Sequence, residues 1–192
     1  KPERLPYLID TIRSSATHML AMINSMLDVA TIERGDFELE KRPNCLNTIV
    51  QDCLRFWTFR AEEKGISINS QLSPLPASAM DGAKIRQVCD NMISNALKYS
   101  PPNTQVDVKC HANENMLVME VIDSGSGIKA EQIQHLFKPF SRVGTKTTGG
   151  EGSIGLGLAI CKTIMEKHGG NIEYAPREDG QSGSVFRITI PV

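Results

Sequence analysis

Four polar side chains recur at helical spacing in the middle of the chain, and their heads could bind a phosphate group with its metal ion. They are Gln87, Asn91, Asn95 and Lys98, which share one side of a helix because residues three or four apart lie on one face. Asparagine is a mediocre helix former, so two of them one turn apart suggest selection for their amides. Amide oxygens and an ammonium group suit a hydrated magnesium ion and a phosphate chain. The alternative is a solvated polar face without a ligand.

A second candidate site follows an apolar strand pattern from Met116 to Ile122. The next residues, Asp123-Ser124-Gly125-Ser126-Gly127, place two glycines two positions apart. Glycine permits positive φ and lets a ligand approach the backbone closely. Asp123, at the strand end, would have a carboxylate free to accept a hydrogen bond. The same residues could instead form an ordinary turn without a ligand.

A third candidate site lies in a glycine-rich segment. The stretch from Gly144 to Ser153 is too poor in apolar residues to order itself, so we expect a mobile loop there. Gly155-Leu156-Gly157-Leu158 then opens a helix that should end near His168. Glycine-rich backbone leading into a helix N-terminus offers free N–H groups and a positive dipole end to a phosphate. A flexible loop without a ligand is the alternative.

The composition is that of an ordinary globular protein. Of the 192 residues, 40% are hydrophobic and 22% charged, and the net charge of −1 does not support nucleic acid as the main partner. No apolar run approaches the length of a membrane span, and no signal peptide opens the chain. The first residue is Lys1 rather than Met, which suggests an excised fragment. Five cysteines without Cys-x-x-Cys spacing indicate buried thiols in a reducing compartment, so we expect a cytoplasmic protein.

The N-terminal segment has the pattern of a long bundle helix. Apolar residues alternate by four and three from Leu5 to Ala30, which is a heptad seam of more than three heptads. The segment cannot bury such a face alone, so it should pair with another helix, either of a second copy or of a segment missing from this fragment. A core helix of the domain is the alternative. Gly35 should end the helix.

The rest of the chain alternates between strand and helix patterns. The helix that carries Asn91 and Asn95 (the asparagine helix) should stop at the two prolines at positions 101 and 102. The expected elements are, in order, a strand from Phe37 to Lys41, a helix capped by Asn44 or Asn47 and running to about Lys64, a strand from Ile66 to Asn69, the asparagine helix from Asp81, strands from Gln105 to Cys110 and from Met116 to Ile122, a short helix from Lys129 to Leu136, the helix that opens at Gly155, and strands from Asn171 to Tyr174 and from Ser184 to Ile190.

Four motifs thus follow one another in a fixed order, and together they resemble the catalytic, ATP-binding domain of sensor histidine kinases. That family shares its nucleotide-binding fold with gyrase B, Hsp90 and MutL. The stretch from Arg86 to Ser100 looks like the family's N box, and Asp123 to Gly127 looks like its G1 box. Phe137 to Phe140 looks like the F box, and Gly152 to Leu158 looks like the G2 box.

The resemblance implies an architecture and two domains. The fold would be α+β, a two-layer α/β sandwich of the Bergerat ATP-binding type. It would have a mixed sheet of about five strands with three main helices on one face, preceded by the long bundle helix. Residues 36–192 would form the catalytic ATP-binding domain. Residues 1–35 would hold the second helix of the dimerisation and phosphoacceptor bundle, because Leu27 to Gly35 looks like the end of that helix.

The resemblance also implies site roles. Asp123 would accept the adenine amino group, and Asn95, helped by Asn91, would hold magnesium bridging the phosphates. Arg142 to Ser153 would be the ATP lid, and Asn91, Asn95 and Lys98 would be the catalytic group. The residues implied to bind the nucleotide are Asn91, Asn95, Lys98, Tyr99, Asp123, Gly125, Gly127, Ile128, Phe140, Gly152, Gly155, Leu156, Gly157 and Leu158.

The implied reaction is transfer of the ATP γ-phosphoryl group to a histidine, for relay to an aspartate of a response regulator. The implied partners are the phosphoacceptor helix, a second protomer in a homodimer formed through the bundle helix, and the receiver domain of the regulator. The chain departs from the family by lacking the phosphoacceptor box, in which an acidic residue follows the histidine. We expect the acceptor helix upstream of Lys1, and ordinary surface or packing roles for His18, His111, His135 and His168.

Two other functions fit the same motifs. An ATPase machine like gyrase, Hsp90 or MutL would place a glutamate one helical turn before the magnesium asparagine, to activate water. That position is Asn91, which cannot act as a general base, so hydrolysis should be slow. A non-catalytic module that only dimerises and docks partners is the third function, and the complete set of ATP-site residues argues against it.

The chain also departs from the family in its G2 box, where Ser153-Ile154 replaces the usual Gly-Ser or Gly-Thr pair.

Overall fold

The computed structural model describes residues 23–141 and 155–192, together with Ala16, Met19 and Leu20. The chain divides into two compact units, Lys1–Phe37 and Glu38–Val192. Within the described residues, no helix combines the length and the apolar character that crossing a bilayer requires.

The first unit contains a helix that extends over residues 23–33 and ends in a Schellman motif. Gly35 adopts a φ of 78°, and the N–H groups of Gly35 and Asp36 each donate to a carbonyl of the last turn at 3.1 Å. The helix end predicted at Gly35 is therefore confirmed. The heptad positions before Ala16 lie outside the described residues. The exposed apolar residues of this unit are Met19, Leu20, Ile23, Met26 and Leu27.

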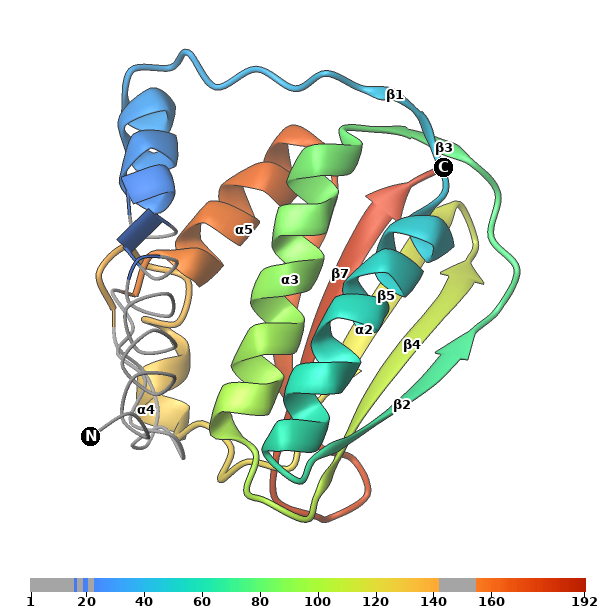
Figure 1. The fold of residues 1–192 in the computed structure, drawn as a ribbon. Coiled ribbons are helices and arrows are strands. Elements are labelled where there is room, and N and C mark those ends of the chain that lie inside the picture. The colour runs from blue at the N-terminus through green and yellow to red at the C-terminus, as the bar shows by residue number, and fades with distance from the viewer. Residues whose placement is uncertain (1–15, 17–18, 21–22, 142–154) are drawn as a thin grey trace, which may run out of the picture. The chain divides into compact units, whose positions relative to one another are not determined.

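The second unit is a two-layer α/β sandwich (Figure 1). Its elements are β1 (Arg42–Asn44), α2 (Leu46–Glu63), β2 (Ser67–Leu72), β3 (Ser78–Met80), α3 (Gly82–Tyr99), β4 (Gln105–Asn113), β5 (Met116–Ile122), α4 (Ala130–Ile133), α5 (Gly157–Lys167), β6 (Asn171–Pro176) and β7 (Ser184–Pro191). Five strands form one sheet in the order β2-β4-β5-β7-β6, in which β2 is parallel to β4 and the other neighbours are antiparallel. Helices α2, α3 and α5 cover one face of the sheet, which confirms the predicted fold class.

The core lies between the three helices and the sheet because each helix has an apolar stripe and the central strands are apolar. In α3 the apolar residues at three- and four-residue spacing are all buried: Ile85, Val88, Cys89, Met92, Ile93, Ala96 and Leu97. Asp81 caps this helix, since its Oδ1 accepts hydrogen bonds from the backbone N–H groups of Ala83 and Lys84, both at 3.1 Å. The N–H of Asp81 donates to Nε2 of His168 at 3.0 Å, so this buried histidine ties the end of α5 to the start of α3.

The strand predicted from Phe37 to Lys41 is wrong, because strand pairing starts only at Arg42. The short strand β1 pairs with β3, which the sequence pattern did not reveal. Before it, the backbone N–H of Glu40 donates to Oδ2 of Asp81 at 3.0 Å. This segment therefore takes a side-chain acceptor where the alternating pattern suggested a strand ladder.

The caps predicted for α2 are also wrong, since Cys45 occupies the N-cap position without a side-chain bond. The amide nitrogen of Asn44 donates to the Met80 carbonyl at 2.9 Å, and that of Asn47 donates to the Ser73 carbonyl at 2.7 Å. Both asparagines thus link the start of α2 to the segment between β2 and α3. The helix predicted from Lys129 to Leu136 shortens to the single turn of α4.

Candidate functional site

The polar strip of α3 contains one internal hydrogen bond that decides which amide atoms stay available. Nδ2 of Asn95 donates to Oδ1 of Asn91 at 2.9 Å. The oxygen of the Asn95 amide makes no hydrogen bond to any described residue. Both side chains are half-buried, so this oxygen lies at a partly shielded surface. Further along, Nζ of Lys98 lies 6.0 Å from the ring centre of Tyr99.

The N-terminus of α5 meets this strip directly. Gly157 is the first residue of α5, and a Cβ at that position would overlap the side-chain amide of Asn91. A larger residue here would displace the Asn91 amide, so glycine is favoured by close approach rather than by backbone conformation. Figure 1 shows α5 beside α3 on the same face of the sheet. The N–H groups of the first turn of α5, which have no acceptor within the helix, and its positive dipole end thus adjoin Asn91.

The described residues on either side of positions 142–154 adjoin each other. Gly155 has a φ of 78°, and a Cβ there would overlap the carbonyl of Ser141. Phe140 also has a positive φ, of 60°, which is uncommon for a bulky residue, and its side chain is 64% exposed. The predicted lid from Arg142 to Ser153, including Gly152, lies outside the described residues.

Asp123 is held at the end of β5 by backbone N–H groups. Its residue exposure is only 4%, and its Oδ1 accepts hydrogen bonds from the N–H of Gly125 at 2.8 Å and of Ser184 at 3.0 Å. Burial raises the pKa of this carboxyl above its usual value, while the two N–H donors, the Ser184 side chain and the Arg177 charge oppose that rise. Oδ2 makes no hydrogen bond to a described residue, so it is the oxygen that a ligand could use.

The C-terminal end of α3 lines the same loop. The N–H of Ser124 donates to Oγ of Ser100 at 3.2 Å, and a Cβ on Gly125 would lie 3.0 Å from the carbonyl oxygen of Tyr99. Burial raises the pKa of Tyr99. One helix therefore contacts two of the three candidate motifs, the aspartate loop at its end and the α5 glycines at its middle. At the far end of the aspartate loop, the N–H of Ile128 donates to the Tyr174 hydroxyl of β6 at 3.3 Å, and Gly127 lies near the Gly183 carbonyl.

Sequence patterns did not reveal that the β6–β7 connection completes the aspartate loop. Oγ of Ser182 donates to the Gly125 carbonyl at 2.8 Å. Gly183 has a φ of 144°, and a Cβ there would overlap the Asp123 carbonyl. The Ser182-Gly183-Ser184 triplet had only the signature of a turn. A glycine just before a strand that neighbours β5 was the available signal.

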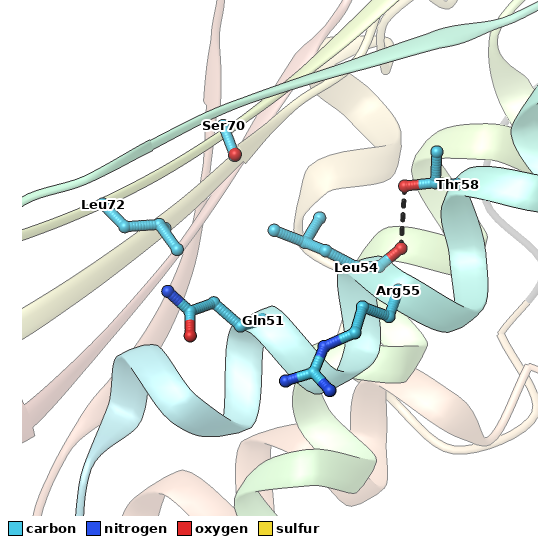
Figure 2. A pocket seen from close by; sticks show the side chains of 6 residues that line it. All are labelled: Gln51, Leu54, Arg55, Thr58, Ser70 and Leu72. Carbon is cyan, nitrogen blue, oxygen red and sulfur yellow. Dashed lines mark hydrogen bonds between the residues drawn. The ribbon is translucent and has the colours of Figure 1, made fainter.

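A pocket of about 320 Å³ lies elsewhere, between α2 and β2 (Figure 2). Thr58 donates its hydroxyl to the Leu54 carbonyl at 2.8 Å, as the dashed line shows, so one of its polar groups is already paired. The pocket contains none of the motif residues. Its lining consists of Gln51, Leu54, Arg55, Thr58, Ser70 and Leu72.

The chain matches a protein-family model over residues 80–192, described as histidine kinase-, DNA gyrase B- and HSP90-like ATPase. The sensor protein KdpD of Escherichia coli is 34% identical over 183 residues, which is 94% of this chain and 20% of that protein. An uncharacterised sensor-like histidine kinase of Rhizobium meliloti is 32% identical over 184 residues, 95% of this chain and 35% of that protein. The chain thus spans about a fifth to a third of these relatives.

Solved structures have the same fold. Full-length ShkA in complex with AMPPNP matches with a TM-score of 0.80 at 26% identity, over 97% of this chain and 38% of that one. The histidine kinase ThkA in complex with the response regulator protein TrrA matches with a TM-score of 0.72 at 24% identity, over 100% of this chain and 52% of that one. With the family match over more than half of its residues, the chain belongs to the histidine kinase-, DNA gyrase B- and HSP90-like ATPases, as a catalytic domain of the sensor histidine kinase type.

Proposed function

We propose that this chain binds Mg-ATP along α3 and is the part of a two-component sensor kinase that supplies the γ-phosphoryl group to a histidine. The observation that carries the proposal is that α3 adjoins two unlike sites. One is a buried carboxylate with an unbonded oxygen, at Asp123. The other is the hydrogen-bonded amide pair of Asn91 and Asn95, whose Asn91 lies against Gly157 at the N-terminus of α5. The first suits a base amino group and the second suits a phosphate chain.

Each end of the nucleotide would use different chemistry. Oδ2 of Asp123 would accept the adenine amino group, while Gly125 and Gly127 would let the backbone lie close to the base. The N–H groups that open α5, with Gly155, Leu156, Gly157 and Leu158, would bind the phosphates. Lys98 and Tyr99 would reach the phosphates and the sugar. Ile128, Phe140 and Gly152 complete the proposed nucleotide-binding residues.

The donors around Asn95 suit a hard divalent cation. No group of three or more His, Cys, Asp or Glu side chains in the described part of the chain is arranged to hold a metal. A magnesium ion would therefore rely on the amide oxygen of Asn95, helped by Asn91, on water and on the phosphates themselves, which is how Mg²⁺ usually binds with nucleotides. When bound, it would neutralise charge on the phosphates. Asn95 would hold it and α5 would orient the phosphate chain.

In the proposed transfer a histidine ring nitrogen attacks the γ-phosphorus, the phosphorus–oxygen bond to ADP breaks, and phosphohistidine forms. The chain's own residues contribute positioning and charge neutralisation, which supply most of the catalysis in phosphoryl transfer. Asn91 supports a kinase over a hydrolase. Its amide cannot take a proton from water, and its oxygen already accepts the Asn95 hydrogen bond.

The partners are proposed on the same basis. The first-unit helix, with its exposed Met19, Ile23 and Met26, would pair with the phosphoacceptor helix and a second protomer. A response-regulator receiver domain would then take the phosphoryl group from histidine. Five free cysteines, four of them buried, suit a cytoplasmic location.

Calorimetric titration of the purified chain with ATP, with and without magnesium, tests the binding part. We expect magnesium to strengthen binding. Asn95→Ala should weaken Mg-ATP binding about 10- to 100-fold, because a charge-assisted contact is lost. Asn69→Ala is the matched control, since Asn69 lies in β2 and, among the described residues, its side chain bonds only Asp107, at 2.9 Å. Equal affinity of Asn95→Ala and the control would contradict the metal assignment.

Incubation with γ-labelled ATP tests the transfer. The chain extended by the segment that precedes it in its parent protein should take label on a histidine of that segment. The 192-residue chain alone should take none, because its histidines lack the phosphoacceptor context. Efficient labelling of the chain alone would contradict this account.

A further inference from the structure

Arg177, just after β6, is a nearly buried arginine whose bonds all lie beside the aspartate loop. Its side chain is 10% exposed. Nη1 donates to the carbonyl oxygen of Asp123 at 3.1 Å and to Oγ of Ser124 at 3.4 Å. The guanidinium thus bonds the backbone of the residue whose carboxylate would read the base.

The opposite edge of the same guanidinium is fixed by Asp179. Nε donates to Oδ1 of Asp179 at 3.0 Å and Nη2 donates to Oδ2 at 2.5 Å, which is a bidentate pair. Oδ1 also accepts the N–H of Gln181 at 3.1 Å, so the pair is built into the turn of the β6–β7 connection. The Arg177 hydrogen bond lowers the pKa of Asp179 to about 2, and the aspartate therefore stays charged at neutral pH. Because Asp179 holds the Nε and Nη2 edge of the planar guanidinium, Nη1 points in a fixed direction.

Two further contacts from the same connection reach the same loop. Oγ of Ser182 donates to the Gly125 carbonyl at 2.8 Å, and Gly183 lies so close to the Asp123 carbonyl that only glycine fits. Arg177 is the charged member of this set, and its Nη1 bonds two acceptors on the loop. Its removal would leave the Asp123 carbonyl without this donor while the Oδ1 bonds remain.

We propose that Arg177, oriented by Asp179, is a positioning residue for base selection: it holds the Asp123 loop so that Oδ2 of Asp123 points at the adenine amino group. This inference rests on the proposed function and adds a residue to it. Loss of Arg177 lets the loop backbone turn, so the direction of Oδ2 varies and the base contact weakens. The phosphate side, around Asn95 and Gly157, shares no hydrogen bond with Arg177 and keeps its affinity.

The experiment measures the dissociation constants of Mg-ATP, Mg-GTP and magnesium tripolyphosphate, a probe without a base. Arg177→Gln should weaken ATP about tenfold, lower the preference for ATP over GTP, and leave tripolyphosphate unchanged. Arg177→Lys keeps the charge but not the fork, so it should restore part of the preference. Asp179→Asn should shift the same ratio by a smaller factor.

Arg187→Gln is the matched control, because Arg187 bonds Glu120 at 2.8 Å and Glu173 at 2.7 Å within the sheet and does not touch the aspartate loop. It should leave the ATP to GTP ratio as in the wild type. An Arg177→Gln protein that keeps the ratio, or that loses ATP and tripolyphosphate affinity equally, overturns the inference. If circular dichroism shows that Arg177→Gln does not fold, the ATP to GTP ratios of Arg177→Lys and Asp179→Asn are used instead. Wild-type ratios in both of these variants overturn the inference. A wild-type chain that binds no ATP refutes the proposed function instead.

Discussion

The two ends of the candidate nucleotide site are held by different kinds of contact. At the base end, the loop after β5 is fixed from three sides by α3, by β7 and by the β6–β7 connection. At the phosphate end, the contacts include the hydrogen bond from Nδ2 of Asn95 to Oδ1 of Asn91 and the close approaches of Gly157 to Asn91 and of Gly155 to Ser141. The base end is thus already organised, while the phosphate end keeps an amide oxygen without a hydrogen bond.

This difference suits the two tasks. Discrimination between bases needs a hydrogen-bond acceptor held in one direction, because a mobile acceptor would adapt to either base. Phosphates and a hydrated cation are less directional, and they need unpaired oxygens, free N–H groups and room. The structure therefore fixes Asp123, which would recognise the base, and leaves the candidate ligands of the phosphate end available for binding.

The largest effect is expected at the base end, for Asp123→Asn. The isosteric amide can keep its oxygen on the N–H groups of Gly125 and Ser184, so its NH₂ would face the adenine amino group, donor against donor. ATP affinity should fall about 100-fold and the preference over GTP should vanish. Thermal stability should not fall, because burial already disfavours the charged form. Unchanged selectivity in calorimetric titration would show that Asp123 does not read the base.

A smaller effect is expected at the phosphate end, for Gly157→Ala. Alanine favours helix over glycine by about 1 kcal/mol, so intrinsic propensity alone would stabilise α5. Its Cβ would overlap the Asn91 amide, however, and this amide would have to move. We expect ATP and tripolyphosphate affinities to fall together, by about tenfold, with the ATP to GTP ratio kept. Lys162→Ala, on the exposed side of α5, is the control. A selective loss of ATP would mean that the two ends are not separate.

The smallest effect is expected from pH. Because burial raises the pKa of Asp123, its carboxylate is protonated at a higher pH than in the unfolded chain. ATP affinity should therefore fall as the pH is lowered. At the folded-state pKa of Asp123 it should be about twofold weaker than at high pH. The stability contribution has the opposite sign: between the unfolded and the folded pKa the folded state binds more protons, so it gains stability as pH falls. Asp123→Asn controls for titration of the nucleotide, and an equal pH profile in both proteins would exclude Asp123 as the source.

Local patterns were enough for the helices, the central strands and the candidate ligands. The three- and four-residue spacing of α3 separates its buried stripe from its amide strip, and glycine at positions 125, 155 and 157 marks close approach. These features depend on neighbours within one element. The wrong strand at Phe37 to Lys41 and the missed β3 have the opposite cause, because short strands are decided by the partner that they meet.

Only the tertiary structure brings the base end together. Arg177, Ser182 and Ser184 lie more than fifty positions after Asp123 in the sequence, and nothing in their local context marks them as its partners. They meet it because β7 pairs with β5, so that Val185 lies opposite Ile122 and the β6–β7 connection falls beside the loop after β5. The sequence by itself indicated which side chains are candidates to bind a nucleotide, and it determined on which face of α3 they lie. Strand pairing joins residues that are far apart in the sequence, and it decided which residues hold Asp123 in place.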